Sequence, residues 1–87
     1  MIEGELNLFE NTISGSIPVE LGRLSDLTIL EIGNNFLTGT IPSEIGSLFG
    51  LNSLSLVSNF FSGPIPTEIG QLYFLSVYLA LMELHSF

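Results

Sequence analysis

One pattern of 24 residues is repeated along this chain, and no other feature limits its fold as strongly. When residues 27–50 are aligned with residues 51–74, 11 of the 24 positions are identical. Residues 3–26 carry the same pattern, and the element Gly-x-Ile-Pro recurs in all three copies. A fixed period of about 20 to 50 residues is typical of a solenoid, in which each repeat forms one coil and neighbouring coils stack. The chain therefore has room for about 3.5 such repeats.

The segment 27–33 has the alternation expected of a short β-strand. Leu30 and Ile32 alternate with Glu31 and Gly33, which places the aliphatic side chains on one buried face. The other copies carry aliphatic residues at the matching positions, so we expect one strand in each coil. Strands joined by such crossovers lie parallel, and the crossovers are right-handed in nearly all proteins.

The second half of each copy predicts a turn followed by a short helical segment. Gly39 stands where the chain must turn, and a residue without Cβ adopts a conformation there that other residues resist. Pro42 suits the first helical position, and Glu44 then lies near the positive end of the helix dipole. Gly46 follows soon after and is expected to end the segment. We predict a short turn of 3₁₀ helix in each coil.

An asparagine follows each predicted strand, where the aliphatic alternation would place it inward. An amide side chain carries both donors and an acceptor, so stacked copies can satisfy backbone groups at the turn and join one coil to the next. We interpret this column as a structural ladder. Its members are Asn11, Asn35 and Asn59.

The residues from Leu27 to Leu48, LTILEIGNNFLTGTIPSEIGSL, resemble the plant-type leucine-rich repeat. The resemblance implies an α/β-type right-handed leucine-rich-repeat solenoid, with parallel strands on the concave face and short 3₁₀ turns on the convex face. It further implies that the chain is a fragment of the ectodomain of a receptor-like kinase, a receptor-like protein or a similar protein.

The domain organisation that we expect is a single array over residues 1–87. Its repeats cover about 3–26, 27–50 and 51–74, and a degenerate partial repeat follows at 75–87. The partial repeat departs from the pattern at Tyr78, Ala80, Glu83 and His85. The chain has no cysteine and thus lacks the cysteine-bearing end caps common in the family's receptors. Exposed aliphatic rows at its ends are therefore expected to favour end-to-end self-association.

The function implied by the resemblance is the binding of a protein or peptide ligand within a receptor-like recognition domain. Two alternatives stay open: a structural fragment without a ligand site of its own, and an inhibitor of enzymes. The parent protein is expected to be extracellular or anchored at the plasma membrane. This stretch of sequence shows neither a secretory signal nor an apolar run long enough to span a bilayer.

Ligands of this family usually lie along the exposed strand positions of the concave sheet, where neighbouring copies of this chain differ most. Phe9 and Val57, on either side of Gly33, are expected to form a small apolar patch there. The full set of candidate binding residues is Glu5, Asn7, Phe9, Ile29, Glu31, Ser53, Ser55 and Val57.

Composition and charge exclude several other functions. The formal net charge is −8 and Arg23 is the sole Lys or Arg, which argues against binding of nucleic acid or anionic membranes. A basic partner would be steered toward the chain, but the role of the acids in keeping an apolar chain soluble explains the charge better. The chain has one histidine and neither lysine nor cysteine, so we expect no catalysis, no cofactor and no metal site. The acids of the column Glu20, Glu44 and Glu68 could hold a cation, but solvated carboxylates at helix N-termini explain them better.

Overall fold

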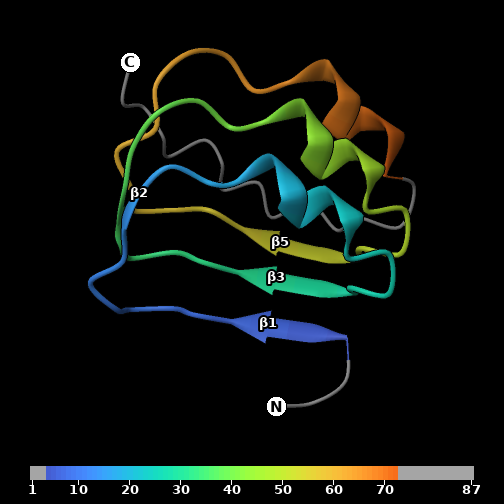
Figure 1. Cartoon of the computed structure of the whole chain (residues 1–87), viewed down its shortest axis with the longest axis horizontal. Helices are drawn as coiled ribbons and strands as arrows, with labels where there is room; N and C mark the ends of the chain where they lie inside the picture. Colours follow the sequence, from blue (N-terminus) through green and yellow to red (C-terminus); the bar gives the residue numbers. More distant parts are fainter. Residues whose placement is uncertain (1–3, 73–87) are drawn as a thin grey trace.

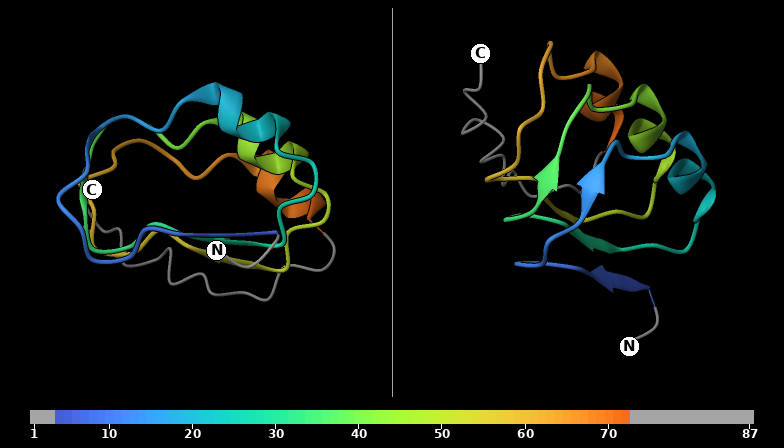
Figure 2. Two further views of the ribbon diagram at one scale, coloured as in Figure 1. Left: turned by 60° about the horizontal axis from the view of Figure 1, so that its bottom comes forward. Right: turned by 60° about the vertical axis from the view of Figure 1, so that its left-hand side comes forward.

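The computed structural model describes residues 4–72, which form three stacked coils (Figure 1). Each coil contributes a strand to one sheet and a 3₁₀ helix to the opposite side, and the view along the stack in Figure 2 shows the coils superposed. The elements in chain order are β1 (Glu5–Asn7), β2 (Ser14–Gly15), η1 (Val19–Arg23), β3 (Ile29–Glu31), β4 (Phe36–Leu37), η2 (Ser43–Ser47), β5 (Ser53–Ser55) and η3 (Thr67–Gln71). The partial repeat predicted at 75–87 lies outside the described residues.

The main sheet has the strand order β1-β3-β5, and all neighbours are parallel. Leu6 pairs with Leu30, and Leu30 with Leu54, so equivalent residues of successive coils lie side by side. The predicted parallel sheet with one strand per coil is confirmed. Its ladder continues past the strand ends, because the Glu10 N–H donates to the Gly33 carbonyl at 2.9 Å and the Asn34 N–H to the Val57 carbonyl at 2.9 Å.

The predicted 3₁₀ turns are also confirmed, with one difference at each end. Pro42 has φ of −72° and ψ of 143° and therefore precedes the helix as its N-cap rather than opening it. The prediction that Gly46 ends the helix is wrong, because η2 continues to Ser47. A Cβ on Gly46 would lie 2.6 Å from both the Cβ and the carbonyl oxygen of Glu68. This glycine therefore allows η2 and η3 to pack in close contact.

A second, two-stranded parallel sheet was not predicted. In it, β2 pairs with β4, with Ser14 opposite Phe36, and Figure 2 shows the two strands side by side on the flank. The Phe60 N–H donates to the Leu37 carbonyl at 2.8 Å, so the third coil continues the same hydrogen-bond pattern. Segments this short, rich in Ser, Thr and Gly, carry no clear alternation, which is why the sequence pattern misses them.

The corner between the two sheets has unusual backbone geometry. Glu10, Asn34 and Ser58, one per coil, have φ between 57° and 63°, a region that is uncommon outside glycine. Gly39 has φ of 81°, which confirms the predicted turn conformation at that position.

Asparagine side chains stabilise this corner from inside. The Asn59 amide nitrogen donates to the Ile32 carbonyl of the preceding coil at 2.9 Å, and its oxygen accepts the Leu37 N–H at 2.9 Å. Asn35 bonds in the same way to the Leu8 carbonyl and the Ile13 N–H of the first coil. Asn11 is exposed and donates only to carbonyls of its own coil.

The core consists of aliphatic side chains that stack in rows from one coil to the next. Leu30, Leu48 and Leu54 are fully buried, whereas Leu24, the first-coil counterpart of Leu48, keeps 47% of its surface exposed. An apolar cavity of about 220 Å³ lies in the first coil, and Leu6, Leu8, Ile13 and Leu21 are among the residues that line it. The first coil therefore buries its aliphatic residues less completely than the second, which lies between two described coils.

Replacing Gly46 by alanine is expected to destabilise the chain. Because the new Cβ meets backbone and side-chain atoms of Glu68 at 2.6 Å, η2 and η3 must separate, at a cost of about 1–3 kcal/mol. The matched control is Gly50→Ala, whose Cβ would meet nothing closer than 3.5 Å. Urea unfolding followed by circular dichroism measures both variants. Equal midpoints would show that close helix packing is not required.

Asn59→Ala is expected to lower the free energy of unfolding by more than Asn11→Ala does. The first change leaves the buried Leu37 N–H unpaired, which costs about 1–3 kcal/mol. It also removes one of the two amide donors to the Ile32 carbonyl, which keeps its hydrogen bond from Asn35. The second removes only bonds that water can replace. The same urea titration compares the two, and an equal loss in both variants would contradict the assignment.

Candidate functional site

The solvent-facing side of the β1–β3–β5 sheet, here called the concave face, carries the predicted binding residues in register. Two of their rows run across the three strands. The strand pairing aligns Glu5 with Ile29 and Ser53 in one row, and Asn7 with Glu31 and Ser55 in the next. The structure therefore brings these residues, which lie far apart in the sequence, onto one continuous face.

The Glu31 side chain is oriented by the backbone next to it. Its carboxylate accepts the Gly33 N–H at 3.2 Å. In the first coil, the Asn7 side-chain oxygen accepts the Phe9 N–H at 3.1 Å in the same manner. These short-range bonds restrain a carboxylate and an amide at the centre of the face, and a restrained side chain loses less entropy when it binds a ligand.

Phe9 and Val57 lie on either side of Gly33 at the ends of the strands. The ladder hydrogen bonds from Glu10 to Gly33 and from Asn34 to Val57 extend the register to this row. A Cβ on Gly33 would lie 3.1 Å from the Val57 side chain and 3.4 Å from the Glu31 carboxylate. Val57 therefore packs over the glycine, with the Glu31 carboxylate next to it, while Phe9 stays 42% exposed.

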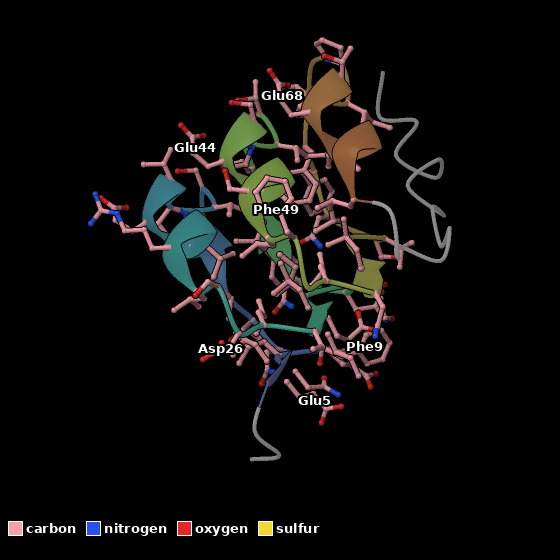
Figure 3. The ribbon with its side chains drawn as sticks, turned by 90° about the vertical axis from the view of Figure 1, so that its right-hand side faces the viewer. Glu5, Phe9, Asp26, Glu44, Phe49 and Glu68 are labelled. Carbon is pink, nitrogen blue, oxygen red and sulfur yellow. The ribbon has the colours of Figure 1, made fainter. Side chains whose placement is uncertain are left out.

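Carboxylates are distributed on both sides of the molecule. Figure 3 shows Glu5 and Phe9 at the strand end of the molecule and Glu44 and Glu68 along the row of 3₁₀ helices. Glu20, Glu44 and Glu68 each lie in the first turn of their helix, as predicted. Within residues 4–72, no cluster of three His, Cys, Asp or Glu residues could hold a metal ion.

One exposed feature was missed by the sequence reasoning. The rings of Phe36 and Phe60 stack with their centroids 6.1 Å apart and an interplanar angle of 15°. Both occupy the position directly after the ladder asparagine, so a repeated aromatic column was the available signal. This pair lies on the flank formed by the second sheet, away from the concave face.

The described part of the chain has no helix long and apolar enough to cross a bilayer. The polar side chains on the solvent-facing side of the main sheet are an amide, hydroxyls and carboxylates. Such an open surface suits the binding of an extended segment of another chain rather than the enclosure of a small molecule.

Solved structures similar to this chain are plant receptor proteins. Over 82% of the chain, the structure of the plant peptide hormone receptor RGFR1 in complex with RGF2 is 49% identical, with a TM-score of 0.80. The PEPR1–AtPEP1 structure is 52% identical over 82% of the chain, with a TM-score of 0.79. The Arabidopsis receptor kinase HAESA, in complex with the peptide hormone IDA and the co-receptor SERK1, is 38% identical over 80% of the chain, with a TM-score of 0.79.

The chain spans only 11%, 10% and 12% of the lengths of these three proteins, respectively. A comparison with curated proteins found no match. The sequence model of the Leucine Rich Repeat family matches residues 5–24, 26–48 and 50–72. With most of its length matched and with the coil geometry described above, this chain belongs to the leucine-rich-repeat family.

Proposed function

We propose that the concave face binds a peptide or protein segment, as part of a longer receptor-like protein that is extracellular or anchored at the plasma membrane. The observation that carries the proposal is the register of the sheet, which aligns solvent-facing, mostly half-buried residues of three coils. The similarity to receptors solved in complex with peptide hormones supports it. We also propose that the whole chain, residues 1–87, forms one array that binds rather than catalyses.

The chemistry of the face favours a ligand that carries both a basic and an apolar side chain. Glu5 and Glu31 offer carboxylates, and the chain's sole arginine, Arg23, belongs to η1 and not to the main sheet. Val57 offers apolar surface near the Glu31 carboxylate, and Phe9 offers an exposed ring in the first coil. A charge-assisted hydrogen bond to Glu31, together with an apolar anchor on Phe9, would align a peptide across the strands.

Panning a random peptide library against the immobilised full chain tests this function. We expect the selected peptides to contain Lys or Arg next to an aromatic or aliphatic residue. Their affinity, measured by isothermal titration calorimetry, should fall about threefold to tenfold for Glu31→Gln and for Phe9→Ala. The matched controls, Glu44→Gln and Phe49→Ala, change exposed residues outside the main sheet.

Controls that weaken binding as much as the two concave-face variants would contradict a concave site. A library that gives no saturable binder would favour the alternative of a structural spacer.

The open apolar side of the first coil supports a proposal about self-association. Leu24 is 47% exposed in this coil, and the half-buried Leu6, Leu8 and Leu21 line an apolar cavity of the same coil. Another apolar surface, such as that of a second copy, would bury these side chains, at about 25 cal/mol for each Å² of apolar area.

Leu24→Glu is therefore expected to shift the isolated chain toward monomer in sedimentation-velocity experiments, because it places a charge on that surface. Phe49→Glu serves as the control, since Phe49 is also exposed, at 62% against 47% for Leu24, but lies after η2 in the second coil. An unchanged distribution for Leu24→Glu would place any association elsewhere.

A further inference from the structure

The stacked pair Phe36 and Phe60, here called the flank stack, is an exposed aromatic surface that the core does not require. The exposed fractions of the two residues are 51% and 61%. The next residue in each coil, Leu37 or Phe61, is buried and belongs to the core. The aromatic rings of the flank stack therefore remain available to another molecule.

The residues around the flank stack are small. The strand pairing places Ser14 opposite Phe36, and Thr38 and Ser62, two residues beyond each ring, are exposed hydroxyl residues. The first coil adds no third ring to the stack, because it carries Thr12 at the equivalent position of its repeat. The two rings accordingly stand above a surface of small polar side chains, without a bulky neighbour among these residues.

Charge is absent from the flank and present along its borders. The segments 11–19, 35–43 and 59–67, which contain the second sheet and its continuation, have no charged residue. Glu10 precedes the first segment, and Glu20, Glu44 and Glu68 follow the three segments, all of them exposed. The flank is thus a neutral aromatic strip bordered by carboxylates, on a chain whose net charge is −8.

We propose that the flank stack is a docking site for an arginine side chain of a partner protein. The face of an aromatic ring carries negative electrostatic potential and attracts a cation placed over it. A guanidinium is planar and weakly hydrated, so it stacks on aromatic rings more readily than an ammonium group does. The surrounding carboxylates raise the local concentration of cationic groups and orient the approaching partner.

Charge complementarity selects this occupant over a second copy of the chain. Two copies that met at this flank would bring their exposed glutamates close to one another, and like charges that face each other disfavour such a contact. A basic segment of another protein would instead meet both the aromatic rings and the acidic border. The site is separate from the concave face, so a longer parent protein could bind a peptide on one surface and a protein on the other.

The chain contains no tryptophan, and a single Phe60→Trp substitution therefore provides a fluorescent reporter within the stack. The probe is a short, acetylated Gly/Ser peptide that carries arginines, titrated into the full 87-residue chain at low ionic strength. We expect a saturable change in tryptophan fluorescence that weakens as salt is added. The same peptide with glutamine in place of arginine should give no saturable change.

Three matched variants distinguish a cation–π site from nonspecific binding. Phe49→Trp places the reporter at an exposed site after η2, outside the stack, and should not respond to the arginine peptide. In the Phe60→Trp background, Phe36→Leu keeps apolar area but removes the second ring, and it should weaken binding about twofold to fivefold. Phe36→Tyr retains a ring and should preserve the affinity. Circular dichroism establishes that each variant is folded.

The proposal is overturned if the glutamine peptide binds as tightly as the arginine peptide. It is equally overturned if the Phe49→Trp reporter responds like Phe60→Trp, or if Phe36→Leu leaves the affinity unchanged. As a measurement without substitution, amide chemical shifts of the unaltered chain should move at Phe36, Thr38 and Phe60 when the arginine peptide is added. Shifts confined to the concave strands would assign arginine binding to that face and refute the flank site.

Discussion

The packing of each coil against the next is the interaction on which the rest of this structure depends. Leu30 loses all solvent contact in the central strand, which has a paired strand on either side. Leu24 and Leu48 occupy the same position in successive coils, yet only the second is buried. An isolated coil cannot bury its own aliphatic row, so stability arises between coils rather than within them. Hydrogen bonds from Asn35 and Asn59 add a polar connection across the same boundary.

Close stacking also determines what the surfaces can present. On the helical side, Gly22 and Gly46 let successive 3₁₀ helices approach until the following glutamate packs against the glycine backbone. On the strand side, the parallel register aligns equivalent positions, so residues 24 apart in the sequence become neighbours. The aliphatic positions that recur in each coil point inward, so the residue types at the outward positions can differ between coils. Any binding surface of this chain is therefore assembled from several coils at once.

The molecule presents two surfaces of different chemistry. The concave face combines the carboxylates of Glu5 and Glu31 with hydroxyls and the apolar pair Phe9 and Val57. The flank carries stacked phenylalanine rings within an uncharged strip. Both are exposed, and both lie within the acidic field of a chain with only one basic residue. This shared field would attract cationic groups to either surface, whereas the side chains that each surface offers to a partner differ.

The sequence by itself determined the solenoid, because its period, its aliphatic alternation and its Gly-x-Ile-Pro elements are local signals that repeat in register. It also indicated which columns face inward, and hence the rows offered as a binding face. Only the tertiary structure revealed why Gly46 is a glycine, since the atoms that exclude a side chain belong to Glu68 in another coil. The second sheet and the stacking of Phe36 on Phe60 were likewise decided by contacts between coils. A linear pattern records which residue types recur, but the distance between two coils is set by all the side chains packed between them.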